Sequence, residues 1–138
     1  MSARDYHLYH KKLPALEGRR CFVTLATNSI KLHIDEVKKD GTFLWLDPPW
    51  EFRKDGAVIE SSASCPNHTE QDYERCFHDW GARFQPIFES IIYGLTADPN
   101  GGLQVMLSDG YQIILPEDQS SETESWYDHW YYTEPKNA

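Results

Sequence analysis

The sequence predicts a mainly β fold of the α+β class, with about eight antiparallel strands in a sandwich or a curved sheet and one helix near residues 70–81. Several short runs alternate apolar and polar residues, which is the two-residue period of a strand with one solvated face. One order of runs and turns occurs twice, about 70 residues apart, so two similar β units are expected. A single segment between them has helical spacing.

The first β unit is expected over residues 13–62. Its strands are predicted at 19–27, 30–35, 42–47 and 57–61. The run SIKLHID alternates strictly and predicts one solvated face. The run TFLWLD is apolar almost throughout, which favours a strand covered on both faces. Asp40-Gly41 is the turn between these runs, and Pro48-Pro49 ends the second run because proline cannot donate to a sheet.

The second β unit is expected over residues 87–132 and repeats this order. Its strands are predicted at 88–96, 103–108, 111–115 and 124–132. Asp109-Gly110 is the turn equivalent to Asp40-Gly41 of the first unit, and Pro116 ends the last run of the hairpin as Pro48-Pro49 does in the first unit. Residues 29–47 and 103–115 are therefore predicted to form superposable hairpins.

The helix is predicted over residues 69–85, with its best-defined part at 70–81. Thr69 is the expected N-cap, and acidic residues follow it in the first turn, where negative charge is favourable. Gly81 or Pro86 is expected to end the helix. An apolar stripe at helical spacing predicts packing on a sheet; it comprises Tyr73, Cys76, Phe77, Trp80 and Phe84.

The 138 residues are expected to form one domain, 1–138, with an N-terminal arm at 1–12 and a tail at 133–138. With 13 Lys plus Arg against 22 Asp plus Glu, the formal net charge is −9, which argues against a surface for nucleic acid or anionic lipid. No apolar run is long enough for a membrane span, and the first residues lack the apolar core of a signal peptide. The three widely spaced cysteines fit reduced thiols, so a cytoplasmic location is expected.

Negative charge is concentrated in the C-terminal part of the chain. Residues 1–85 have a net charge of −1, whereas residues 86–138 have a net charge of −8 and Lys136 as their only basic residue. The acids of this part cluster at Glu117, Asp118, Glu122, Glu124 and Asp128. An ordinary solvated loop would also have such a cluster, so the neighbouring aromatic residues decide the interpretation.

Five aromatic residues lie within seven positions of the same segment: Trp126, Tyr127, Trp130, Tyr131 and Tyr132. They cannot all face inward on one strand, because successive side chains point to opposite faces. We expect Trp126 and Trp130 in the core and Tyr127 and Tyr131 outside; a slip of one residue would exchange the two sets. Exposed tyrosines beside carboxylates have the composition of a binding hot spot for a basic protein. The predicted partner-binding residues are Glu117, Asp118, Glu122, Glu124, Tyr127, Asp128 and Tyr131.

No metal ion and no cofactor are expected. Cys65, His68, Cys76 and His78 lie within 14 residues and are of the types that bind zinc. On a helix, however, Cys76 and His78 are two positions apart and point in different directions, and Cys76 belongs to the apolar stripe. On the N-terminal arm, His7 and His10 are expected to be surface histidines.

The sequence contains no nucleophile motif of the G-x-S-x-G type and no phosphate-binding loop. Asp47, Glu51, Glu117 and Asp118 follow equivalent strands of the two units, and two carboxylates across a cleft would suit glycoside hydrolysis. Domains of this size rarely form such a cleft, so the protein is not expected to be an enzyme.

The chain contains LPALEGRRC at residues 13–21, then two hairpins, SIKLHID…GTFLWLDPPW and GGLQVMLSDGYQIILPED, and then Glu124-Ser125-Trp126. This layout, over roughly residues 13–132, resembles small bacterial immunity proteins that accompany polymorphic or contact-dependent growth inhibition toxins. The resemblance implies a non-enzymatic cytosolic protein that binds and neutralises one cognate toxin domain. The family has no catalytic set that could be assigned to residues of this chain.

The residues and the resemblance lead to the same hypothesis, an immunity protein that neutralises a basic toxin domain by stoichiometric binding. A nuclease is a suitable target, because its site is built for phosphate and complementary charge accelerates association. The alternative is a small-molecule or carbohydrate-binding β module, since exposed Trp and Tyr also stack on sugar rings. An enzyme and a structural subunit are further alternatives, and the sequence leaves the oligomeric state open.

Overall fold

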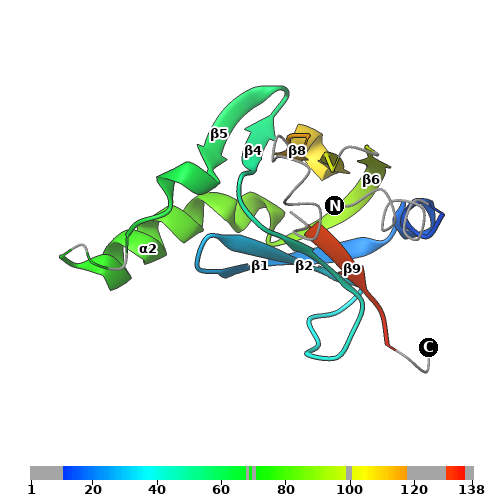
Figure 1. Cartoon of the computed structure of the whole chain (residues 1–138), viewed down its shortest axis with the longest axis horizontal. Coiled ribbons are helices and arrows are strands. Elements are labelled where there is room, and N and C mark those ends of the chain that lie inside the picture. Colours follow the sequence, from blue (N-terminus) through cyan, green and yellow to red (C-terminus); the bar gives the residue numbers. More distant parts are fainter. Residues whose placement is uncertain (1–10, 68, 70, 99–100, 118–129, 136–138) are drawn as a thin grey trace, which may run out of the picture.

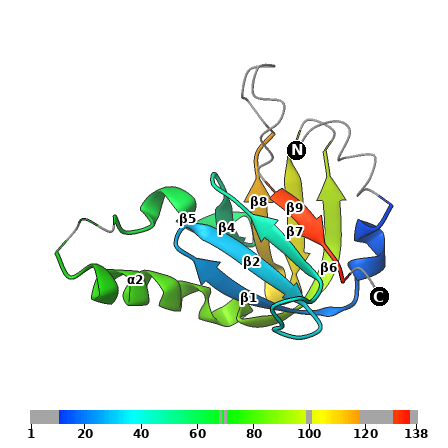
Figure 2. The same ribbon diagram turned by 60° about the horizontal axis from the view of Figure 1, so that its bottom comes forward.

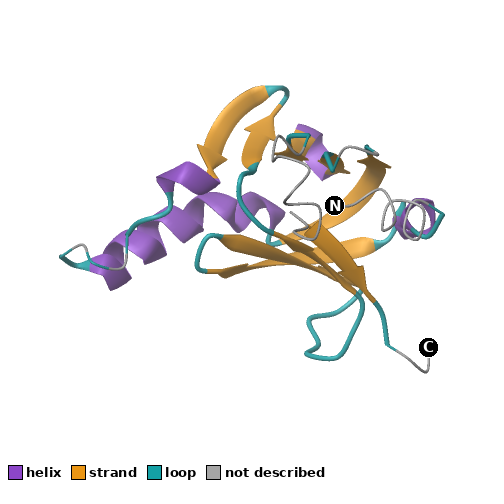
Figure 3. Ribbon diagram, viewed as in Figure 1, coloured by secondary structure: helices purple, strands orange, loops and turns teal. Residues whose placement is uncertain are grey.

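The computed structural model describes residues 11–67, 69, 71–98, 101–117 and 130–135. Within these residues the mainly β fold is confirmed as one open, antiparallel sheet of nine strands with a helical segment against it (Figures 1 and 3). The strands are β1 (Arg20–Ala26), β2 (Ser29–Ile34), β3 (Phe43–Leu46), β4 (Glu51–Lys54), β5 (Ala57–Ser61), β6 (Glu89–Ala97), β7 (Leu103–Leu107), β8 (Tyr111–Leu115) and β9 (Trp130–Thr133). The helices are α2 (Tyr73–Gly81) and the 3-10 turns η1 (Leu13–Leu16), η2 (Ser62–Ser64), η3 (Ala82–Ile87) and η4 (Ser108–Gly110).

The strand order is β5-β4-β8-β7-β6-β1-β2-β3-β9, and, apart from β5 at one edge, it is symmetric about the contact between β1 and β6. From that contact outward, one half reads β1-β2-β3-β9 and the other reads β6-β7-β8-β4. The fourth strand of each half follows the other unit in sequence: β4 follows β3 but pairs with β8, and β9 follows β8 but pairs with β3. The two units therefore exchange their fourth strands.

Matching tryptophans hold the exchanged strands. Trp50 precedes β4 and Trp130 begins β9, and both side chains are at most 1% exposed. The Trp50 Nε1 donates to the Asn28 carbonyl (2.9 Å) in the turn between β1 and β2. The Trp130 Nε1 donates to the Gly101 carbonyl (3.1 Å) in the turn between β6 and β7. The same contact in both halves supports the predicted duplication of the β unit.

The core lies between the two halves of the sheet, which curve toward each other (Figure 1). Leu32 and Leu44 face it from one half, and Val105 and Ile113 face it from the other; all four are fully buried. These residues pair across the two hairpins in the same way, Leu32 with Leu44 and Val105 with Ile113. The η1 turn packs against β6 and buries two further leucines.

The helical segment packs on the sheet through the predicted stripe. Trp80 and Phe84 are buried, and the rings of Trp80 and Trp50 lie 6.0 Å apart. Phe84 stacks on Phe52 of β4 at 5.1 Å. Among the described residues, no helix has the length and apolar character that a membrane span requires.

The start of the helix differs from the prediction. The α-helix begins at Tyr73 and not at 69 or 70, with Asp72 before it in the left-handed region at φ 59°. The side chain of Thr69 does not cap this helix, because the Thr69 amide and hydroxyl both donate to the Asn67 Oδ1 (3.0 and 2.9 Å). The predicted end at Gly81 is confirmed for the α-helix, which continues as η3.

The strand predictions need two corrections at the ends of the units. The short strand β4 was not expected, and it raises the number of strands from about eight to nine. Its turn to β5 contains Asp55 and Gly56, both with positive φ, as in a tight hairpin. Thr133 belongs to β9 and not to a tail, and Glu134 pairs with Lys12 at 2.5 Å.

Candidate functional site

The strand β3 has one buried face, not the two that its apolar sequence predicts. Leu44 and Leu46 face the core and are fully buried. Phe43 and Trp45 point to the opposite face, where both are half-buried. The prediction is wrong because aromatic residues on an uncovered face give the same apolar run as a buried strand.

Phe43 and Trp45 belong to a group of aromatic side chains on the outside of β1, β2, β3 and β9. The pairing register puts His33 opposite Phe43 and Tyr131 opposite Trp45. Figure 2 looks onto these strands, and none of the described helices or strands lies over them. We call this surface the outer aromatic face; its rings are Phe22, His33, Phe43, Trp45 and Tyr131.

Tyr131 is the most exposed ring of the outer aromatic face. Its ring is nearly parallel to that of Trp45, with an interplanar angle of 12° and a centroid distance of 6.3 Å. It meets Phe43 edge-on, also at 6.3 Å. Tyr131 is 38% exposed whereas the preceding Trp130 is fully buried, so the predicted alternation is confirmed at these two positions. Trp126 and Tyr127 lie outside the described residues.

Asp47 fixes the position of the Trp45 indole. Its Oδ1 accepts hydrogen bonds from Trp45 Nε1 (2.7 Å) and from the Ser29 hydroxyl (2.6 Å). Partial burial, together with the negative charge of Asp47, raises the pKa of Tyr131. The Tyr131 hydroxyl therefore stays protonated near neutral pH and can donate a hydrogen bond.

Lys31 and His33 complete the middle of the outer aromatic face. The Lys31 ammonium lies over the Phe43 ring, 4.2 Å from its centroid, in a cation–π contact. His33 is only 4% exposed, and its Nε2 lies 3.0 Å from the Thr24 hydroxyl. Its Nδ1 has no hydrogen-bond partner in the described part of the chain. Burial, and secondarily the charge of Lys31, lower the pKa of His33, so the imidazole is neutral at pH 7.

Of the predicted acidic residues, Glu117 alone is described, and it is exposed. A hydrogen bond with Asp98, and then the charge of Asp98, raise the pKa of Glu117. Asp118, Glu122, Glu124, Tyr127 and Asp128 lie outside the described residues. The backbone of Glu117 and the Trp130 indole both meet the turn formed by residues 98–102. The structure therefore brings Glu117, at the start of the acidic segment (residues 117–128), and Trp130, two residues after its end, to one turn of the sheet.

The carboxylates weighed above for glycoside hydrolysis have other partners where they are described. Asp47 is bonded to Trp45 and Ser29, and Glu51 is paired with Arg53, whose Nε donates to it at 3.0 Å. Asp118 lies outside the described residues. Asp47 and Glu51 therefore hold neighbouring side chains in place.

The three cysteines are free, and two of their thiols are little suited to nucleophilic chemistry. Cys21, Cys65 and Cys76 form no disulfide. Burial raises the pKa of Cys21 to about 12, and it also raises the pKa of Cys65, so both thiols remain protonated at neutral pH. Within the described ranges, no three His, Cys, Asp or Glu side chains are grouped to hold a metal ion. His68, like His7 and His10, falls outside those ranges.

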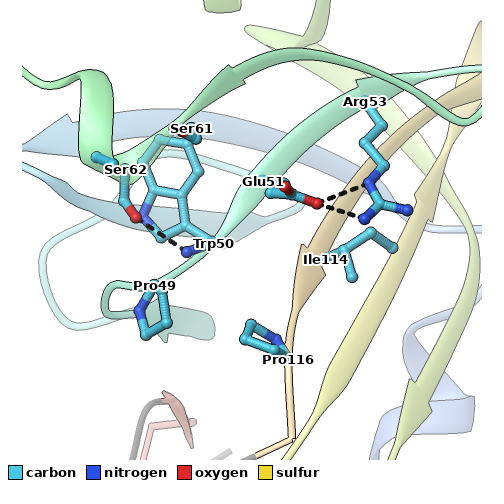
Figure 4. A pocket seen from close by; sticks show the side chains of 9 residues that line it. Pro49, Trp50, Glu51, Arg53, Ser61, Ser62, Ile114 and Pro116 are labelled. Carbon is cyan, nitrogen blue, oxygen red and sulfur yellow. Dashed lines mark hydrogen bonds and ion pairs between the residues drawn. The ribbon is translucent and has the colours of Figure 1, made fainter.

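A cavity of about 350 Å³ lies on the other half of the sheet, between β4, β8 and η2 (Figure 4). Pro49, Ile114 and Pro116 give it apolar walls, and the Glu51–Arg53 pair lies at its side. The backbone amide of Trp50 donates to the Ser62 hydroxyl (3.0 Å) at its inner end. No pattern in the sequence indicates this cavity, because its walls come from segments far apart in the chain.

Comparison of the chain with known protein families, with curated proteins and with solved structures finds no match. Its function is therefore inferred from its residues and their geometry.

Proposed function

We propose that this protein is an immunity-type inhibitor that binds and neutralises a basic toxin domain, of the nuclease type, in a stoichiometric complex. The observation that carries the proposal is the position of Tyr131. This exposed ring belongs to the outer aromatic face and lies three residues after Asp128, the last acid of the acidic segment. The proposed binding surface joins the outer aromatic face to Glu117, Asp118, Glu122, Glu124 and Asp128, with Tyr127 and Tyr131 as aromatic anchors.

The two parts of this surface contribute differently to binding. Rings that become fully desolvated in a complex slow its dissociation, as Tyr and Trp do at the centres of protein interfaces. Carboxylates at the rim attract a basic partner and accelerate association. The net charge of −8 over residues 86–138 is suited to a partner whose own site is built to bind phosphate. Such a partner is blocked without any chemistry by the inhibitor.

The proposal is tested with the protein encoded beside this gene. A candidate toxin domain from the adjacent reading frame is expressed in bacteria, alone and together with this chain. We expect growth to be lost with the toxin alone and restored by co-expression, and an inactivated toxin to form a complex of fixed stoichiometry by size-exclusion chromatography with light scattering. A toxin that remains lethal and forms no complex would contradict the proposal.

A small-ligand-binding module is the second candidate function, because the cavity of about 350 Å³ has the volume of a ligand site. The apolar walls and the nearby Glu51–Arg53 pair would suit a compact, mostly apolar molecule with one polar group. Ile114→Trp would fill this cavity. A compact apolar ligand that binds the wild-type chain but not Ile114→Trp, in a chain that does not neutralise the adjacent toxin, would favour this second function.

A further inference from the structure

Trp45, Tyr131 and Asp47 form a group at the edge of the outer aromatic face. Trp45 and Tyr131 pair directly across β3 and β9, with nearly parallel rings. Asp47 follows β3 by one residue and binds the Trp45 indole through its Oδ1. The group therefore places two aromatic rings and a carboxylate on two adjacent strands, under no described helix or strand (Figure 2).

The Asp47 carboxylate has capacity for a further donor. Its two hydrogen bonds, from Trp45 and Ser29, both end on Oδ1. Among the described residues, none donates to Oδ2, and no lysine or arginine forms an ion pair with Asp47. The two hydrogen bonds orient the carboxylate through Oδ1, and Oδ2 receives no hydrogen bond from the described residues.

Among the described residues, no cation fills the site. Lys31 lies on the same face, but its ammonium rests over Phe43 and not on Asp47. Four arginines are paired with other carboxylates: Arg19 with Asp35, Arg20 with Glu89, Arg53 with Glu51 and Arg83 with Glu60. The Lys31–Phe43 contact shows that a ring of this face already receives a cation.

We infer that Trp45, Tyr131 and Asp47 form a receptor for one arginine side chain of the basic partner, an inference that rests on the proposed function. A guanidinium is planar, so it stacks on an aromatic ring while its N–H groups donate to a carboxylate in the same plane. Lysine lacks this geometry, since its ammonium is a compact and strongly hydrated charge. The acidic segment that ends at β9 brings the basic partner to this edge of the sheet.

The site is tested without the toxin by following the Trp45 indole signal in ¹H–¹⁵N NMR spectra. The chain has five tryptophans, and the Trp45→Phe variant identifies which indole signal belongs to Trp45. The probes are acetyl-arginine amide, its neutral isostere acetyl-citrulline amide, and acetyl-lysine amide. We expect a saturable shift of the Trp45 signal with the arginine probe, a weaker one with lysine and none with citrulline. Equal shifts with arginine and citrulline, or no shift with arginine, would overturn the inference.

Two matched variants separate the Asp47 contact from general negative charge. Asp47→Asn keeps an oxygen for the Trp45 indole but loses the charge, and we expect it to weaken binding of acetyl-arginine amide about tenfold. Asp40→Asn removes the same charge from an exposed position in the loop between β2 and β3, and should leave binding unchanged. If both variants weaken the binding of acetyl-arginine amide equally, the effect is one of overall negative charge, and the inferred arginine receptor is wrong.

The receptor and the proposed function fail in different experiments. If acetyl-arginine amide fails to bind while co-expression still neutralises the toxin, the receptor is wrong and the proposed function stands. If the arginine probe binds as predicted but the toxin domain neither binds nor is neutralised, the receptor is supported and the proposed function is wrong.

Discussion

Tryptophans of the core differ in the hydrogen bonding of their indoles, which gives a test at the scale of single residues. Trp50 donates to the Asn28 carbonyl, whereas the buried Trp80 Nε1 has no partner among the described residues. Replacement by Phe removes the indole N–H from both positions. We expect Trp50→Phe to lower the free energy of unfolding by about 1–3 kcal/mol more than Trp80→Phe. The reason is that Trp50→Phe leaves the Asn28 carbonyl without its hydrogen-bond donor. Urea unfolding of the two variants measures the difference, and an equal or reversed order would contradict the assigned hydrogen bonds.

His33 predicts a pH dependence of stability. Because burial lowers the pKa of His33 in the folded protein, the unfolded chain binds a proton more readily. The stability from the neutral imidazole is therefore complete above the ordinary histidine pKa of about 6.5 and is lost as pH falls through the lower, folded value. We expect His33→Phe to reduce the loss of stability between neutral and mildly acidic pH, measured by urea unfolding.

His78 supplies the control for His33. Its side chain is 85% exposed on α2, so its replacement by Gln should leave the pH dependence of the wild-type protein in place. The same flattening in both variants would show that His33 is not the group responsible.

At the scale of elements, the helical segment is held by its C-terminal part more than by its start. Phe84 is 3% exposed and contacts Phe52, Trp50 and Trp80, whereas Phe77 is only partly buried. We expect Phe84→Ala to lower the free energy of unfolding by about 3–5 kcal/mol, typical of a buried aromatic ring, and Phe77→Ala by clearly less. Thermal unfolding followed by circular dichroism measures both, and a larger effect at Phe77 would contradict the packing.

Periodicity predicts most strands because it depends on local alternation. The runs at β1, β2, β5, β6, β7 and β8 were all expected within a residue or two of their observed bounds. Local sequence patterns fail where the burial or pairing of a residue depends on distant parts of the chain. The apolar run that contains Phe43 and Trp45 predicts burial on both faces, although these two side chains lie on the outer aromatic face. The polar run at β4 has too few residues to show a period. Thr69 has the chemistry of an N-cap, but the chain turns at Asp72 instead.

At the scale of the whole molecule, the exchange of β4 and β9 could not be predicted, because no local pattern tells which distant strand an edge strand joins. One signal does exist in the sequence. Trp50-Glu51-Phe52 and Trp130-Tyr131-Tyr132 share the spacing of a Trp and an aromatic ring two positions later, and both pairs face the core. The alternation that buries Trp130 also exposes Tyr131, so this part of the candidate site was predictable. Trp45, Phe43 and Asp47 became part of it only through pairing with β9.

We propose that the acidic segment and the outer aromatic face bind one and the same basic partner. The most direct test is the rate of association and dissociation with an inactivated cognate toxin domain, measured against ionic strength. We expect Glu122→Lys with Glu124→Lys and Asp128→Lys to slow association steeply at low salt and less at high salt, where charges are screened. Tyr131→Ala should instead speed dissociation, by a factor that corresponds to about 2 kcal/mol. Unchanged rates in both folded variants, with neutralisation intact, would contradict the claim.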